Sequence, residues 1–554
     1  MAEREAGGAE RLKRLALCTL HYVLLFLGEL NLNASEVKKQ VLWADDEIDL
    51  LRPHAMFLGE RGYEVTPVTN GDDAIEMVKQ RSFDIVLLDE MMAGRDGLST
   101  LAAIKDINPN IPVIMITKNE EERLMEDAIG QRIDDYLTKP VNPSQILMAC
   151  KKQLDARQIQ KDRMGVGYTS ASNRIRDMLS DANHWQDWID LHVRLSEWDL
   201  ELDKYQDPGL RAMHDDLRRA CNLEFGKFME ANYGGWVHDD EEDTPLLSVD
   251  IVSEFVAPRI KNGEQVFLIV IDCMRLDHWF AISSALTDIF NIEQNYYYSI
   301  LPTATPYSRN AIFSGLFPID VAKLYPDEWK VARDDDTSRN RHEHQLLDRQ
   351  LEEIDPTLKI ETRYVKVLDI AEGTRMAKKV HSYRSFPLMS VVYNFLDFLT
   401  HGRSESELLQ EIAPNESAYR SLTRSWFMHS SLFEMLRRLA ETDSTVIITT
   451  DHGCVLSKRA TLAHGNRDTS TGLRFKYGKS LRADDRHAHT VQDPEAYGLP
   501  STGPGTNYIL SKEDYFFVYP TNFNEYQAKY SDSFQHGGIS LEECILPVAV
   551  LKGK

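Results

Sequence analysis

The chain has 554 residues, a formal net charge of −24 and a hydrophobic fraction of 42%. This length predicts two to four domains, and 22 Tyr, 21 Phe and 8 Trp provide enough large apolar side chains for several cores, which argues against global disorder. The acidic balance argues against general affinity for the nucleic-acid backbone, which requires a basic face, although a locally basic site stays open.

Residues 1–38 form an N-terminal extension in which basic residues precede an apolar run from Leu15 to Leu27. The pattern resembles a signal peptide or a short membrane anchor. The run is too short for a transmembrane helix and contains His21. The alternative is that the translation start is misassigned, because Val37 would be a normal first residue for the domain that follows. The six cysteines are scattered without a C-x-x-C, which predicts reduced thiols and a cytoplasmic protein.

Residues 39–155 alternate between apolar strand-like runs and helical stretches. The runs are "QVLWADD", "GYEVTPV", "FDIVLLDE", "IPVIMITK" and "DDYLTKP", and helices are expected at Asp72–Gln80 and Gly97–Ile107. Continuous Val/Ile/Leu runs between helices are typical of a doubly wound parallel sheet. Functional residues in such a sheet gather at the carboxyl ends of the strands.

Polar side chains stand at those strand ends: Asp45, Asp46, Asp89, Thr117 and Lys139. Three carboxylates at one edge repel one another unless a cation balances them, and Mg²⁺ does so with few protein oxygens. Asp89 could then attack a phosphoryl donor while Lys139 offsets the developing charge. Any one of these aspartates alone is more often a strand-end cap, so the prediction rests on all of these residues occurring together.

This conjunction resembles the receiver domain of two-component response regulators. The resemblance implies Mg²⁺ held by Asp45, Asp46 and Asp89, phosphorylation of Asp89 by a sensor histidine kinase, and a switch made of Thr117, Tyr136 and Lys139. Two positions depart from the family pattern. Ala93 replaces a usual proline, and Lys118 replaces a usual small residue, which puts access of a phosphatase or a small acyl-phosphate donor in doubt.

Residues 156–247 lack a strand pattern and contain apolar residues near helical spacing, for example Trp185, Trp188, Ile189 and Val193. They predict a helical bundle that joins two larger domains.

In residues 248–554 strand signals return in "EQVFLIVID", "STVIITTDHG", "EDYFFVYP" and "EECILPVAVLK". Helices are expected between them, for instance at Met389–Leu399 and Ser431–Ala440. The alternation predicts a second and larger α/β domain.

This last domain carries a series of aspartates and histidines suited to zinc or another transition ion. In chain order they are Asp272, Asp397, His401, Asp451, His452 and His536. Each fragment has a structural alternative: "DHG" is also a turn signal, a D-x-x-x-H spacing is frequent by chance, and a single histidine is more often simply hydrogen-bonded. The order in which they occur favours a metal site.

The segment "SILPTATPYSRNAIFSGLFP" brings hydroxyl groups into the same domain, with Ser299, Thr303, Thr305 and Ser308 as candidates. A hydroxyl is a poor nucleophile at neutral pH, but a divalent metal lowers its pKa, and two metals can stabilise the attacking and the leaving oxygen of an in-line displacement.

The order of these motifs resembles the alkaline phosphatase superfamily, and "VFLIVIDCMRLDHW" and "HGGISLEECILPV" resemble its PglZ branch. The resemblance implies an alkaline-phosphatase-like α/β domain with two zinc ions beside a Ser/Thr nucleophile. One zinc would be held by Asp272, Thr305, Asp451 and His452, and the other by Asp397, His401 and His536. The "PTAT" pattern points to Thr305 as the nucleophile. Tyr307, Arg309 and Asn310 are candidate neighbours of the phosphoryl group, Asn310 foremost.

From Lys458 to Arg486 there are eight Lys or Arg and three Asp or Glu. This predicts a basic rim that recruits an anionic substrate such as an oligonucleotide, with His464, Arg474 and Lys476 as candidates. A solvated loop is the alternative.

The order receiver, helical bundle, PglZ domain resembles the PorX-type family of response regulators, associated with type IX secretion. This implies a phosphorylation-dependent homodimer with a zinc-dependent phosphodiesterase or phosphatase output and a sigma factor or secretion component as candidate partners. No helix-turn-helix with a basic helix is found, so stable duplex DNA binding is not predicted. Two alternatives stay open: a non-catalytic, protein-binding PglZ domain, and a monoesterase or transferase.

Overall fold

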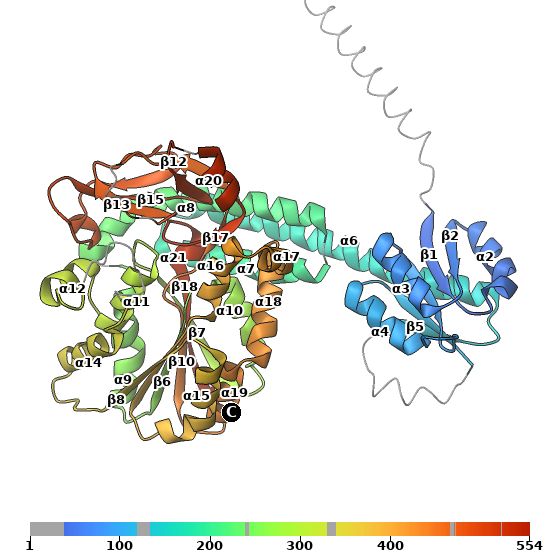
Figure 1. The fold of residues 1–554 in the computed structure, drawn as a ribbon, viewed down its shortest axis with the longest axis horizontal. Helices are drawn as coiled ribbons and strands as arrows, with labels where there is room; N and C mark the ends of the chain where they lie inside the picture. The colour runs from blue at the N-terminus through green and yellow to red at the C-terminus, as the bar shows by residue number, and fades with distance from the viewer. Residues whose placement is uncertain are drawn as a thin grey trace, which may run out of the picture. The chain divides into compact units, whose positions relative to one another are not determined.

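The structure is a computed structural model and describes residues 38–118, 133–205, 207–238, 243–329, 340–465, 470, 472–521 and 523–554 (Figure 1). The predictions for residues 1–37 lie outside this range. The chain divides into two compact units, one ending at Val166 and the other spanning Gly167–Lys554. Within the described range, no helix combines the length and the apolar character needed to cross a membrane.

The first unit contains a five-stranded parallel sheet with the strand order β2-β1-β3-β4-β5. Side chains that alternate along β1 enter two different apolar cores, Val41 and Trp43 on one face and Leu42 and Ala44 on the other. Both faces are therefore covered, as in a doubly wound sheet, and the predicted fold class is confirmed. The elements are β1 (Lys39–Ala44), η1 (Ile48–Leu51), α2 (Arg52–Gly59), β2 (Tyr63–Val68), α3 (Gly71–Gln80), β3 (Ile85–Asp89), α4 (Gly97–Ile107), β4 (Val113–Thr117) and β5 (Asp135–Thr138).

The helical linker consists of α6 (Pro143–Asp181), α7 (Trp185–Tyr205) and α8 (Pro208–His238). Helix α6 is 39 residues long and begins in the first unit and ends in the second. The predicted boundary between residues 155 and 156 therefore falls within a continuous helix. Apolar periodicity alone does not reveal this, because a helix can continue where its buried partners change.

The second unit is built on a six-stranded sheet with the order β7-β18-β10-β6-β9-β8, shown in Figure 1 between two layers of helices. Strands β8, β9, β6 and β10 are parallel, and β18 runs antiparallel to β10 and β7. Its strands are β6 (Val266–Ile271), β7 (Phe290–Tyr298), β8 (Thr362–Val367), β9 (Leu388–Tyr393), β10 (Thr445–Thr449) and β18 (Ile545–Gly553).

Alternate residues of β6 enter different cores. Val266 and Leu268 pack with α8, α11 and α14, whereas Phe267 and Ile269 pack with α10, α15 and α19. The helices of this unit are η2 (Ser248–Asp250), η3 (Val252–Val256), α9 (Ala257–Lys261), α10 (Leu276–Ser283), α11 (Thr305–Ser314), α12 (Pro318–Leu324), α14 (Glu343–Ile354), α15 (Ile370–Tyr383), α16 (Phe395–Glu405), α17 (Glu407–Ile412), α18 (Glu416–His429), α19 (Ser431–Ala440), η4 (Glu495–Tyr497), α20 (Phe523–Tyr530) and α21 (Leu541–Cys544).

Three small sheets complete the unit. They pair β11 (Val455–Ser457) with β17 (Ser533–Gln535), β12 (Arg459–Leu462) with β16 (Tyr515–Val518), and β15 (Thr506–Ser511) with both β13 (Phe475–Lys479) and β14 (Ala488–Val491).

The prediction of one helix over Met389–Leu399 is wrong. Residues Leu388–Tyr393 form β9, which is buried along its whole length between β6 and β8, and α16 begins only at Phe395. A short apolar run fits a buried strand and a helix equally well, and the β-branched pair in "LMSVVY" suits the strand. The helix expected at Ser431–Ala440 coincides with α19.

Buried ion pairs join the linker helices to the larger α/β domain. Arg218 of α8 pairs with Asp199 of α7 and, at 2.9 Å, with Glu542 of α21. The side chain of Asn222 donates to Glu542 at 3.0 Å and accepts from the backbone amide of Leu541 at 2.7 Å. Because these polar groups are buried, each requires its partner, and together they hold α21 against α8.

We expect Arg218→Met to lower the free energy of unfolding of the second unit by about 3–5 kcal/mol, since it leaves the buried carboxylate of Glu542 without its ion-pair partner. Urea unfolding followed by tryptophan fluorescence measures the change. The control is Arg219→Met in the next position, where an exposed pair with Asp216 contributes about 0–1 kcal/mol. Equal transition midpoints in the two variants would contradict the role given to Arg218.

Candidate functional site

The predicted phosphorylation site lies at the carboxyl edge of the first sheet. Asp45 and Asp46 follow β1 and Asp89 ends β3, and one carboxylate oxygen from each lies within 4.8 Å of the others. Lys139, just after β5, places its Nζ 3.0 Å from Asp45 Oδ2 and 2.9 Å from Asp89 Oδ1. Parallel strands thus bring together four residues that span much of the domain in sequence.

The electrostatics of this edge suit a cation. Burial raises the pKa of Asp89, and the neighbouring carboxylates of Asp45 and Asp46 add to the rise, whereas the contact with Lys139 lowers it. Burial alone would lower the pKa of Lys139, but its hydrogen bonds to Asp89 and Asp45 raise it overall. Three oxygen donors with excess negative charge fit Mg²⁺, which these three aspartates would hold.

Two of the three predicted switch residues lie on adjacent strands. Thr117 ends β4 with its side chain almost fully buried, and Tyr136 lies on β5, where it pairs in register with Met115. Lys118, which departs from the receiver pattern, is exposed. The switch function of Thr117 and Tyr136 stays a prediction.

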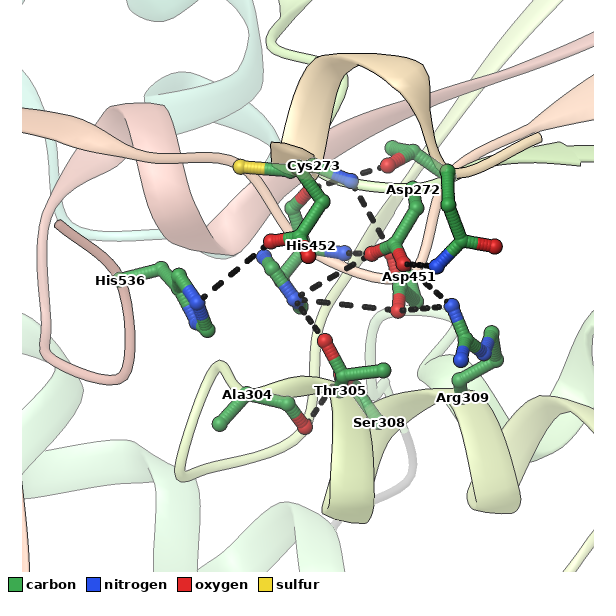
Figure 2. Close-up of polar contacts among 12 residues, drawn as sticks. Asp272, Cys273, Ala304, Thr305, Ser308, Arg309, Asp451, His452 and His536 are labelled. Atoms are coloured by element: carbon green, nitrogen blue, oxygen red, sulfur yellow. Dashed lines mark hydrogen bonds and ion pairs between the residues drawn. The ribbon is translucent and has the colours of Figure 1, made fainter. Parts of the chain in front are cut away.

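In the second unit, three of the predicted metal ligands follow two adjacent parallel strands (Figure 2). Asp272 follows β6, and Asp451 and His452 follow β10. All three are fully buried, and Nε2 of His452 lies 3.8 Å from Asp272 Oδ1 and 3.8 Å from Asp451 Oδ2. The adjacency of β6 and β10 joins motifs nearly 180 residues apart.

The other three ligands form a second group beside the first. Asp397 and His401 lie one turn apart on α16, and His536 follows β17. Asp397 Oδ1 lies 3.3 Å from His401 Nε2 and 3.8 Å from His536 Nε2, and the two Nε2 atoms are 3.2 Å apart. The rings of His452 and His536 stack with centroids 4.1 Å apart, so the two groups adjoin.

Both groups fit a divalent cation. Among the described residues, Oδ1 of Asp272, Oδ2 of Asp451 and Oδ1 of Asp397 are buried and have no hydrogen-bond partner. Ligand atoms about 2.1 Å from a tetrahedral zinc ion lie about 3.4 Å from one another, close to the spacings found in each group. Without a cation these oxygens would be costly to bury, so their positions favour a metal.

The pKa values of these side chains reflect the cost of burying a charged group. Burial raises the pKa of Asp272 to about 8, although the Arg309 guanidinium opposes the rise. Burial also raises the pKa of Asp451 and lowers the pKa values of His452 and His536. Both histidines are therefore neutral near pH 7, the form in which an imidazole binds a metal.

A backbone contact orients His452. Its Nδ1 lies 3.1 Å from the carbonyl oxygen of Gly453, so Nδ1 carries the proton and Nε2 is left as an acceptor facing the ligand group. A Cβ at Gly453 would lie only 1.9 Å from the backbone oxygen of Glu542, which explains why glycine follows His452. The DHG motif thus packs directly on α21.

Thr305 differs from the other three candidate hydroxyls. It is the first residue of α11, is only partly buried, and has its Oγ1 2.9 Å from His452 Nε2. Ser299, Thr303 and Ser308 are fully buried and donate to the backbone oxygens of Asp451, Gly538 and Ala304. Of the four, Thr305 alone contacts the side chain of a predicted ligand through these bonds. Figure 2 shows this contact between Thr305 and His452.

The basic rim requires a correction, because Arg474 and Lys476 lie in the interior. Arg474 is 0% exposed and pairs with Glu543 through contacts of 2.9 and 2.5 Å. Lys476 is 1% exposed and donates to the backbone oxygen of Gly472, and burial lowers its pKa to about 8. Neither can attract substrate from solution. His464 is exposed, and its backbone pairs with Arg482.

Helix α11 also positions the predicted phosphoryl neighbours. The Asn310 side chain is buried, donates to Pro306 O and accepts from Asn340, so its contact with substrate stays a prediction. Tyr307 is buried between Trp329 and Phe475.

Arg309 is buried and engages the carboxylates of Asp272 and Glu343, with Asp451 3.8 Å away, instead of facing open space. The sequence contains no signal for Glu343 or Asn394, which also contact this network, because they stand outside any motif.

Comparison with known families and proteins accounts for most of the chain. The family described as the BREX system PglZ alkaline phosphatase-like domain matches residues 251–551, the response regulator receiver domain matches residues 41–151, and the PorX response regulator linker domain matches residues 158–237.

Individual curated relatives match about a fifth of the chain. The transcriptional regulatory protein ResD of Bacillus subtilis is 32% identical over 21% of this chain and 48% of its own length. The alginate biosynthesis transcriptional regulatory protein AlgB of Pseudomonas syringae is 32% identical over 23% of this chain and 28% of its own length. The chain thus spans less than half of either relative.

Among solved structures, the Vibrio cholerae chemotaxis protein CheY4 is 26% identical and covers 21% of this chain and 99% of its own, with a TM-score of 0.20. The PglZ match covers more than half of the chain. The chain therefore belongs to the PglZ family and is a PorX-type response regulator, in which a receiver domain and a linker domain precede the PglZ domain.

Proposed function

We propose that the PglZ domain is a zinc-dependent phosphodiesterase with Thr305 as its nucleophile, regulated by phosphorylation of Asp89. The observation that carries the proposal is the position of the Thr305 hydroxyl, 2.9 Å from His452 Nε2 and beside two adjoining groups of side chains that could hold metal ions. If Thr305 had only a structural role, there would be no reason for buried carboxylate oxygens without hydrogen-bond partners to lie next to it.

The residues divide into two ligand sets. Asp272, Asp451 and His452 would hold one zinc together with Thr305, and Asp397, His401 and His536 would hold the other. When bound, such ions lower the pKa of a coordinated hydroxyl and stabilise charge on the attacking and leaving oxygens. The Nε2 atom of His452 is free of its ring proton because Nδ1 donates to Gly453, so it is ready to bind a cation.

The proposed reaction balances with one water. Oγ1 of Thr305 forms a bond to phosphorus as the bond from phosphorus to the leaving oxygen breaks, and the leaving group departs as an alcohol after taking up a proton. Water then cleaves the Thr305–phosphorus bond and restores the hydroxyl. Because Thr305 is the first residue of α11, the positive end of that helix adds favourable charge at the phosphoryl group.

The charge of the site favours a diester over a monoester. A phosphodiester carries one negative charge, whereas a monoester carries about 1.5 to 2 near pH 7. Arg309 is engaged with Asp272 and Glu343, so its charge balances protein carboxylates and not a second charge on the substrate. Because Arg474 and Lys476 are buried, they no longer support the prediction that the substrate is an oligonucleotide.

The receiver implies a cognate sensor kinase. We propose that the kinase phosphorylates Asp89, that Thr117 and Tyr136 respond, and that the change reaches the second unit through α6, which is continuous across the boundary. As further parts of this proposal, the resemblance to the PorX-type family leads us to expect a role in type IX secretion, a phosphorylation-dependent homodimer, and a sigma factor or secretion component as partner.

Thr305→Ala should reduce turnover of bis-p-nitrophenyl phosphate by roughly three or more orders of magnitude, because the attacking oxygen is removed, while two zinc ions stay bound. The assay uses zinc-loaded protein, with p-nitrophenyl phosphate and short oligonucleotides in parallel. Ser308→Ala, in the same helix, is the control and should retain activity. Undiminished activity in Thr305→Ala refutes the nucleophile, and no turnover by zinc-loaded wild type would favour a protein-binding module.

His401→Ala should lower the zinc content from two ions per chain to one, because only Asp397 and His536 remain in that ligand set, whereas Thr305→Ala leaves three ligands in the other. Zinc is measured by elemental analysis after dialysis against a weak chelator. His464→Ala is the control, since this exposed histidine lies in neither ligand set. Two tightly bound ions in His401→Ala would exclude it as a ligand.

Asp89→Ala should abolish covalent labelling by the phosphorylated kinase or by an acyl-phosphate donor, since the carboxylate proposed to accept the phosphoryl group is then absent. Glu90→Gln in the next position is the control and should be labelled normally. Labelling is measured by intact-protein mass, and a phosphorylated Asp89→Ala chain would move the acceptor elsewhere.

A further inference from the structure

The two oxygens of Asp272 have different surroundings. Oδ1 lies 3.8 Å from His452 Nε2 and has no hydrogen-bond partner among the residues that the structure describes. Oδ2 accepts from Nη1 of Arg309 and, at 2.6 Å, from Nδ2 of Asn394. One oxygen is therefore saturated by the protein, and the other is directed at the metal-binding group.

Asn394 does not serve its own helix. It is the N-cap residue of α16, a position where asparagine usually accepts a hydrogen bond from the first helical turn, yet its side chain makes no such cap. Its amide instead points at Asp272, although Asp272 follows a different strand. Asn394 thus links one ligand set to the start of the helix that carries Asp397 and His401.

Arg309 is itself held rigidly. Its Nε donates to Glu343 at 2.6 Å, and Glu343 also accepts from Asn340 at 2.7 Å and from the hydroxyl of Tyr364. Arg309 lies one turn after Thr305 on α11, so its contact with Asp272 and the contact of Thr305 with His452 fix that helix at two points.

From these contacts we propose that Asn394 and Arg309 are positioning residues that restrict Asp272 to metal binding through Oδ1 alone. This inference rests on the proposed zinc site. Two donors on Oδ2 prevent the carboxylate from turning or binding a metal through both oxygens, and they align the ligand before the metal arrives. Loss of such outer-sphere partners typically weakens metal affinity 10–100-fold.

The test is the zinc affinity of the full-length protein, measured by competition with a chromophoric chelator. Asn394→Ala should weaken one of the two zinc equivalents 10–100-fold and leave the other within about threefold. Arg309→Lys, which keeps the charge but loses the planar fork, should weaken the same equivalent by a smaller factor.

The matched control is Ser390→Ala, four residues earlier on β9, since Ser390 is also buried and its hydroxyl has no hydrogen-bond partner within the described residues. It should bind both ions as the wild type does. The zinc-free forms of Asn394→Ala and Ser390→Ala should have similar melting temperatures, because a structural role for Asn394 would lower its melting temperature without changing zinc affinity.

The outcomes separate this inference from the proposed function. A wild-type chain that binds zinc and an Asn394→Ala chain with the same two affinities would overturn the positioning role alone. An equal loss of affinity at both equivalents would also overturn it, since a general disturbance would then be the cause. A wild-type chain that binds no zinc would overturn both proposals.

Discussion

The burial of Asp272 and Asp451 at the carboxyl ends of β6 and β10 is the constraint on which the second unit depends. Two carboxylates in an apolar interior are costly unless positive charge or hydrogen-bond donors surround them. Arg309 supplies one guanidinium, and the open oxygens beside His452 are left for cations. The placement of α11, of the DHG motif and of α16 follows from the need to surround these two carboxylates.

Buried carboxylates offset by a cationic side chain occur in both units, and the two sites differ in how exposed they are to solvent. In the receiver, Lys139 offsets buried Asp45 and Asp89, while Asp46 stays exposed, so the acidic edge is open on one side to a cation and a phosphoryl donor. In the PglZ domain the proposed ligands Asp272, Asp451 and His452 are fully buried, and the exposed side chain of His401 lies at the open side of the site. Parallel strands produce both sites, since their carboxyl ends meet at one edge.

The linker helices are part of the structure behind the proposed metal site. Arg218 and Asn222 of α8 hold Glu542, and the backbone of Glu542 and Glu543 packs on Gly453, directly after His452. A displacement of α8 would thus reach the DHG motif through α21. This arrangement gives the proposed regulation a physical route within the second unit.

The sequence by itself determined the fold class, the order of the domains and the groups of residues that meet, because apolar runs ending in acids fall at the carboxyl ends of parallel strands whatever their separation along the chain. Tertiary structure decided which charges are buried and where side chains point. Arg474 and Lys476 look like surface charges in sequence, but Glu543 and the oxygen of Gly472 hold them inside. Residues Met389–Leu399 split into a strand and a helix, and Asn394 and Arg309 turn toward Asp272. These outcomes depend on partners distant in sequence, and a partner's position decides whether burying a polar group is favourable.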